Sequence, residues 1–284
     1  MKHSCWTPPP RAGTNTVMFT RIALSQRAML IAFALLLAGL TSRLDAATSL
    51  NTHALVVHTP CLQNLHLLSN SKQSEIARIE GTTPQGITLA PSVVEGATTL
   101  IQHTCSHSGT LTVSVRPDVS LTIDDAGTTN ITLEDRTGPT FIHAGSGTLT
   151  LGKTGELGLF SDSSGPITIS TLAESARIRS EQSAPVTITT IAAPALALYL
   201  GGSASFTAGA GHLKALEITS ASTKDAVFHG VTDVGMFHVQ HSGGISVDKV
   251  TGALATERDG SGKIISDAAA PAPSVRADKA NVLP

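Results

Sequence analysis

One short segment of the sequence carries three side chains that commonly bind transition metals. His103, Cys105 and His107 occupy alternate positions, and alternate residues of a β-strand point to the same side. Two imidazoles and a thiol on one face could begin a zinc site, with His58 or Cys61 as a further ligand. The segment therefore allows a metal-binding function.

The same thiol has a competing use. Apart from Cys5 in the N-terminal leader described below, Cys61 and Cys105 are the two cysteines of the chain. Two cysteines in an oxidising compartment are expected to pair. We predict a Cys61–Cys105 disulfide that closes a loop of about 45 residues, with the metal site as the alternative.

Three further histidines, His229, His238 and His241, lie close together in the sequence. They could form a weak transition-metal site or a pH-responsive patch, or they could be ordinary surface residues in turns.

Acidic pairs occur at Asp124-Asp125 and Glu134-Asp135. Aligned carboxylates are typical of enzymes that cut acidic polysaccharides, but neighbours on a strand face opposite ways, and acids at turns also cap loops. No nucleophile elbow, phosphate-binding loop or zinc-protease motif is present, and the sequence indicates no cofactor. We therefore expect a protein that is not an enzyme.

The elements that would position these residues follow from an internal repeat of short apolar triplets. Two interleaved series repeat every 17 to 21 residues, half a period apart. The first contains Leu111, Ile131, Leu149, Ile167, Val186, Phe206, Val227, Ile245 and Ile264, and the second contains Leu121, Phe141, Leu159, Ile178, Leu198, Ile218, Phe237 and Leu254.

Gly, Pro, Asp, Asn and Ser fall between the two series, where the chain must turn tightly. Two short strands and two turns use about 18 to 20 residues, which matches the period. We predict an all-β parallel β-solenoid (β-helix) with two main strands per turn, and an antiparallel sandwich as the alternative.

Threonines occupy the middle of six triplets of the first series: Thr112, Thr132, Thr150, Thr168, Thr187 and Thr207. They predict an outward-facing ladder along one sheet. Such ladders occur on ice-binding solenoids, but Thr also suits any solvated strand face.

The remaining segments complete the predicted organisation. Residues 1–46 look like a signal peptide, because Arg21 and Arg27 precede an apolar run that is too short to span a bilayer; Met18 is a plausible start. Residues 48–110 lack the period and are predicted to be an N-terminal β cap. The solenoid covers 111–266, and the Ala/Pro-rich tail 267–284 is predicted to be disordered.

The distribution of charged residues limits the classes of partner that the protein is expected to bind. Residues 1–46 hold five of the 19 basic and one of the 21 acidic residues, so 14 and 20 remain. No basic cluster is present, and we expect neither nucleic-acid binding nor a stable membrane span after cleavage. The protein is predicted to be exported to the periplasm or the exterior.

Val113-Ser114-Val115-Arg116-Pro117 precedes the predicted rungs, and Gly145-Ser146-Gly147 and Gly260-Ser261-Gly262 lie between them. Through these residues the segment from Leu111 to Ile264 resembles the bacterial family of auto-transporter adhesins with a head GIN domain. It implies export and a β-solenoid, with adhesion suggested by the family name alone.

These observations favour an exported structural or interaction module of the cell envelope, adhesin-like, whose partner is an envelope protein or a glycan. A stacked solenoid offers long flat faces that suit contacts with a partner surface. The alternatives are a polysaccharide-active enzyme on a β-helix and a periplasmic metal-binding protein.

Overall fold

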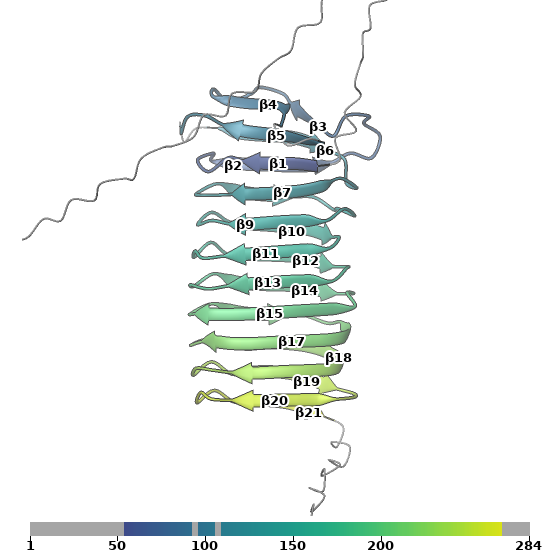
Figure 1. Ribbon diagram of the computed structural model, residues 1–284, viewed down its shortest axis with the longest axis vertical. Coiled ribbons are helices and arrows are strands. Elements are labelled where there is room, and N and C mark those ends of the chain that lie inside the picture. Colours follow the sequence, from purple (N-terminus) through teal and green to yellow (C-terminus); the bar gives the residue numbers. More distant parts are fainter. Residues whose placement is uncertain (1–53, 93–95, 106–108, 269–284) are drawn as a thin grey trace, which may run out of the picture. The chain divides into compact units, whose positions relative to one another are not determined.

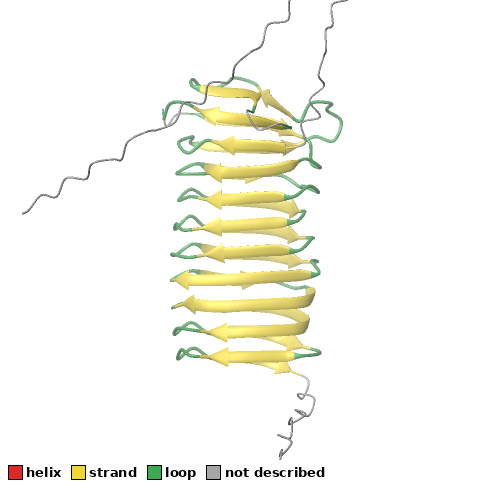
Figure 2. Ribbon diagram, viewed as in Figure 1, coloured by secondary structure: helices red, strands yellow, loops and turns green. Residues whose placement is uncertain are grey.

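The computed structural model describes residues 54–92, 96–105 and 109–268. These residues form 21 β-strands joined by turns (Figure 2). Nearly all paired strands run parallel and stack one above another as rungs (Figure 1). No helix of the described residues has the length and hydrophobicity needed to cross a membrane. The predicted parallel β-solenoid is confirmed.

One stack of strands, here called the aromatic sheet, carries Phe141, Phe160 and Tyr199 on its outer side. It includes the second half of β18 (Ala226–Val239). Its other parallel strands are β1 (Ala54–His58), β5 (Ala97–Gln102), β7 (Ser120–Asp125), β9 (Thr140–Ala144), β11 (Leu157–Ser161), β13 (Ala176–Ser180), β15 (Ala195–Gly202), β17 (His212–Ser222) and β20 (Leu254–Arg258).

The opposite stack, here called the threonine sheet, contains the predicted threonine ladder. It includes the first half of β18. Its other parallel strands are β2 (Asn64–Ser69), β6 (Thr110–Val115), β8 (Asn130–Leu133), β10 (Leu149–Thr154), β12 (Ile167–Leu172), β14 (Pro185–Ile191), β16 (Ser205–Ala208), β19 (Ile245–Val250) and β21 (Ile264–Ala268).

The core lies between the two sheets and is built from like residues in register. Ile167 pairs with Val186, and both are 1% exposed, while Leu198 of the opposite sheet is 3% exposed. Thr168 and Thr187 lie between buried neighbours and are exposed. Because alternate residues face opposite sides, each rung adds a layer of Ile, Leu or Val to one continuous core.

The predicted inward series is wrong at two positions. Val227 aligns with Thr207 on the outer face, and the inward positions of that rung are Ala226 and Phe228. Leu254 pairs with Gly235, which lies two positions before Phe237 on the same buried side of the sheet, and it packs against the core as predicted.

Phe141 is the second misassigned residue, because it points outward and is 48% exposed. Ile142 takes the inward position, between Ile123 and Leu159. The smaller branched side chain matches those neighbours, and Gly158 leaves room for the phenyl ring outside.

The N-terminal rungs do not follow chain order. The rung formed by β1 and β2 lies between the β5–β6 rung and the β7–β8 rung. Leu65, for example, pairs with Leu111 on one side and Ile131 on the other. The chain therefore bypasses the β1–β2 rung when it passes from Val115 to Ser120.

The region predicted as a cap, 48–110, is divided differently in the structure. Residues 54–69 and 97–102 form parallel solenoid strands. Among the described residues of this region, only β3 (Ala77–Glu80) and β4 (Ile87–Pro91) pair antiparallel, with β6 and β5 respectively. These two strands cover the backbone edge of the terminal rung, which would otherwise be open to association.

Corner residues set how closely successive rungs approach. Gly127 has φ 49°, and a Cβ there would lie 2.2 Å from the Pro60 carbonyl oxygen. A Cβ on Gly145 would lie 1.8 Å from the Gly127 carbonyl oxygen. The amides of Thr128 and Ser146 donate to these same two oxygens, at 2.8 and 2.7 Å. Only glycine fits at such stacked corners.

One arginine is enclosed at the corner after β8. Arg136 is 2% exposed, and its guanidinium donates to the carbonyl oxygens of Arg116 and Val119. Its Nε atom has no hydrogen-bond partner. Burial lowers the pKa of Arg136 to about 10, and the charge of Asp118 partly offsets that shift. The guanidinium thus ties two turns together at an electrostatic cost.

The C-terminal boundary also differs from the prediction. Asp267 and Ala268, placed in the predicted tail, belong to β21 and pair with Lys249 and Val250. The predicted signal peptide, 1–46, and the rest of the predicted tail, 269–284, lie outside the described residues.

Candidate functional site

The predicted disulfide is present. Cys61 and Cys105 are bonded, with their Cα atoms 5.2 Å apart and 44 positions apart in sequence. Cys61 lies in the turn after β1, and Cys105 lies just after β5. The bond therefore joins two stacked rungs that are separated in the chain by β3 and β4.

The metal site predicted from His103, Cys105 and His107 loses its thiolate to this disulfide. The His103 Nε2 atom lies 3.1 Å from the hydroxyl of Thr88. His107 lies outside the described residues. His58, considered as an extra ligand, pairs through Nδ1 with Asp124 at 3.2 Å.

Three of the four carboxylates in the acidic pairs accept hydrogen bonds from backbone amides, and the fourth, Asp124, pairs with His58. The Asp125 carboxylate accepts a hydrogen bond from the Gly127 amide at 3.0 Å. Glu134 accepts one from the Ser69 amide at 2.7 Å, and Asp135 accepts one from the Lys153 amide at 2.8 Å.

His229, His238 and His241 do not share one site in the described contacts. His229 pairs with Asp248 at 3.4 Å, and His241 contacts its neighbour Ser242. His238 lies between Glu257 and Asp259.

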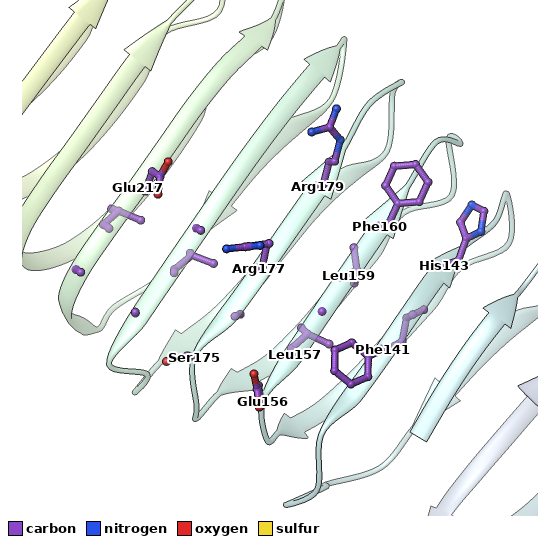
Figure 3. A pocket seen from close by; sticks show the side chains of 18 of the residues that line it. Phe141, His143, Glu156, Leu157, Leu159, Phe160, Ser175, Arg177, Arg179 and Glu217 are labelled. Atoms are coloured by element: carbon purple, nitrogen blue, oxygen red, sulfur yellow. The ribbon is translucent and has the colours of Figure 1, made fainter. Parts of the chain in front are cut away.

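A groove of about 990 Å³ runs along the outer side of the aromatic sheet, from β7 to β18 (Figure 3). Its floor follows one outward column whose members are paired strand to strand. This column consists of Thr122, Phe141, Gly158, Arg177, Ala197, Glu217 and Met236. Small and large side chains alternate along it from Thr122 to Glu217, which creates the hollow.

Phe141 and Gly158 shape one end of the groove. A Cβ on Gly158 would lie 2.7 Å from Cδ1 of Phe141, so the ring lies over the glycine. Met236, 49% exposed, and Val234, 41% exposed, lie at the other end. Exposed apolar side chains gathered along one strip are unusual on a solvated sheet and indicate a contact surface.

A second outward column borders the groove with aromatic and cationic groups. The rings of His143 and Phe160 lie 5.0 Å apart. The Arg179 guanidinium lies 4.2 Å from the centre of the Tyr199 ring and forms an ion pair with Glu181. These contacts place aromatic and cationic groups of neighbouring rungs against one another beside the groove.

Charges in the groove are spread out. Arg177 stands on its floor, between the aromatic end and the apolar end. Glu156 lies just before β11 and Glu217 lies on β17, three rungs apart. At about 4.8 Å per rung these carboxylates are separated by roughly 14 Å along the stack.

Sequence reasoning did not find the groove. The repeat predicts which residues alternate, but it misplaces Phe141, the residue that marks the groove. A usable signal was present: Thr140-Phe141-Ile142-His143 also fits an alternation in which Ile142 points inward. Comparisons with protein-family models, curated proteins and solved structures gave no match to this chain.

Proposed function

We propose that this chain is an exported interaction module of the cell envelope, adhesin-like, which holds an extended acidic glycan along the groove of its aromatic sheet. The single observation that carries this proposal is the strip of exposed Phe, Met and Arg side chains lining one groove. The disulfide supports export, because such bonds persist in oxidising compartments.

The groove suits a long partner. It spans seven strands, which is about 29 Å at 4.8 Å per rung. The rings of Phe141 and Phe160 offer flat apolar contacts to sugar faces, and Arg177 offers two donors to a carboxylate. The groove is open along its length, so a chain end is not required for binding.

A binding role fits better than glycan cleavage. Enzymes that hydrolyse glycosidic bonds place two carboxyl groups between about 5 and 9.5 Å apart. Glu156 and Glu217 are farther apart than that, and Asp124 is paired with His58. Glu156, Glu217 and Asp124 therefore do not form a pair of carboxyl groups at the separation that glycoside hydrolysis requires.

The test compares the two faces of one protein. The full chain, with any N-terminal leader removed as in the exported form, is titrated with polygalacturonate and with neutral dextran. Arg177→Glu and Phe160→Ala alter the groove, and Thr187→Glu places the same charge on the threonine sheet.

We expect polygalacturonate to bind and dextran not to bind. Arg177→Glu should weaken binding by about tenfold or more, and Thr187→Glu should leave it unchanged. Equal binding by all variants, or no binding of the acidic polymer, would contradict the proposal.

A further inference from the structure

We propose a divalent transition-metal site formed by His238, Glu257 and Asp259 at the C-terminal end of the aromatic sheet. This is the one group of three histidine, cysteine or acidic side chains, among the residues that the structure describes, whose ligand atoms lie within 4.8 Å of one another. The site is separate from the disulfide and does not depend on the groove.

The strands hold the three groups together. His238 on β18 pairs in register with Glu257 on β20, so both side chains point outward from the same column. The amide of Asp259 donates to the Val239 carbonyl oxygen at 2.9 Å, which fixes the turn that carries its carboxylate. The ligands therefore come from two stacked rungs and one anchored corner.

The two nitrogen atoms of the His238 imidazole each lie near one carboxylate oxygen. Its Nε2 atom lies 2.9 Å from Asp259 Oδ2, and its Nδ1 atom lies 3.7 Å from Glu257 Oε2. The Gln240 amide nitrogen lies 3.3 Å from Nδ1 and helps to orient the ring. A zinc ion takes nitrogen and oxygen ligands at about 2.0 to 2.2 Å, so donors settle about 3 to 4.4 Å apart. The two carboxylates approach different ring nitrogens, but one nitrogen, one Glu257 oxygen and one Asp259 oxygen lie within 4.8 Å of one another. A metal ion held by one of the nitrogens requires the carboxylates to rotate toward it, which their exposure permits.

His238 differs from the other histidine–acid pairs of the molecule. Its side chain is 25% exposed, whereas those of His58, His143, His212 and His229 are 43% to 60% exposed. It also has two carboxylates, and neither forms an ion pair with a Lys or Arg within the described part of the chain. The two negative charges thus remain available to a cation.

One imidazole and two carboxylates favour particular ions. Imidazole suits Zn²⁺, Ni²⁺ and Cu²⁺, and the carboxylates add charge and hard oxygen donors. Three protein ligands leave coordination positions for water. Because the imidazole must be unprotonated to bind, metal binding competes with protons at this site.

The experiment uses the tag-free full chain and Zn²⁺ as the calorimetric probe, with Co²⁺ absorption as a second readout of the ligand set. His238→Ala removes the nitrogen ligand. Asp259→Asn and Glu257→Gln keep the size of an exposed side chain and remove its charge, so folding should be retained. His212→Ala is the matched control, because His212 pairs with Asp233 at 2.8 Å in a similar exposed, cross-rung geometry.

We expect one Zn²⁺ per chain at the highest-affinity site. His238→Ala should abolish this binding, each carboxylate variant should weaken it about tenfold or more, and His212→Ala should leave it unchanged. If His238→Ala fails to fold, the two carboxylate variants decide the matter. Absence of 1:1 binding, or equal affinity in Asp259→Asn, Glu257→Gln and the unmodified protein, would overturn the assignment.

Discussion

From β7 onward the solenoid stacks its rungs in the order of the chain, whereas the rungs that precede β7 do not. In the later part, each strand pairs with strands one repeat away in sequence. In the earlier part, the β1–β2 rung has neighbours that both come from later in the chain. The two parts share one core and one register, so the solenoid geometry does not require that the chain be wound continuously.

Rungs are also joined in different ways in the two parts of the solenoid. Rungs in the regular part are connected by the short corners that lead from one to the next. The β1–β2 rung is joined to the β5–β6 rung by hydrogen bonds, core packing and the Cys61–Cys105 bond. The β1–β2 rung, which lies between two rungs that come later in the chain, is called the inserted rung below. Substitutions can test whether it contributes as much to the stability of the fold as a regular rung.

The largest effect is expected from charges placed in the core of either part. Leu65→Asp in the inserted rung and Ile167→Asp in a regular rung should each destabilise the protein by more than about 4 kcal/mol, because both side chains are at most 1% exposed. Urea unfolding measures both. If Leu65→Asp costs far less, the inserted rung is a peripheral cap.

Matched outward substitutions provide the control for this pair. His66→Asp and Thr168→Asp change the residue next to each buried position on an exposed face. Both should change the free energy of unfolding by less than about 0.5 kcal/mol.

The next largest effect concerns the disulfide. Replacing both Cys61 and Cys105 by Ser should lower the free energy of unfolding by about 2 to 4 kcal/mol, since the bond closes a loop of 44 positions in the unfolded chain. Non-reducing urea unfolding measures the loss. Reduced unmodified protein should behave like the double variant; a variant as stable as the oxidised protein would show that packing alone secures the inserted rung.

A smaller effect is expected at Arg136, near the junction between the two parts. Arg136→Ala should cost about 2 kcal/mol, because it leaves a cavity and removes the donors of the Arg116 and Val119 carbonyl oxygens. Arg136→Met fills most of the space and removes a buried charge, so it should cost less. Thermal unfolding of the two variants shows which one loses more stability. A larger loss in Arg136→Met than in Arg136→Ala would mean that the charge itself stabilises the corner.

The smallest effect is a pH dependence in the regular part. Hydrogen bonds from His212 and Thr251 lower the pKa of Asp233 below its ordinary value. A carboxyl group with a lowered folded-state pKa adds stability above its unfolded pKa, about 3.9, and loses it as the pH falls through the folded value. The difference in Tm between unmodified protein and Asp233→Asn should therefore shrink below about pH 4. A constant difference down to pH 2.5 would contradict this assignment.

The sequence predicts the regular part well, and the reason is physical. Ile167, Val186 and Leu198 repeat because each layer of the core must match the layer above it. The errors at Phe141 and Val227 arose where an apolar residue stands beside another candidate, since hydrophobicity alone does not say which of two neighbours faces inward. At Val227 the predicted steps of 21 and 18 become 20 and 19 when Ala226 is used.

The inserted rung and the candidate sites were harder to predict. Nothing in residues 54–69 indicates that their neighbours lie 43 positions or more ahead, because register with distant strands is set by three-dimensional packing. The disulfide was predictable because cysteines are few. The groove depends on Gly158 lying next to Phe141 on the adjacent strand, and that adjacency requires the correct register.

The placement of the β1–β2 rung has a consequence for how the protein acquires its structure. Residues 54–69 emerge first from a ribosome or a translocon, but they find both neighbouring strands only after residues up to about 133 have followed. A solenoid that winds in chain order can add rungs to a growing end as the chain arrives. Here the earliest rung gains one neighbour when residues up to about 115 have followed and the other when residues up to about 133 have followed. During that interval Leu65 and its buried neighbours lack the strands that cover them in the folded protein.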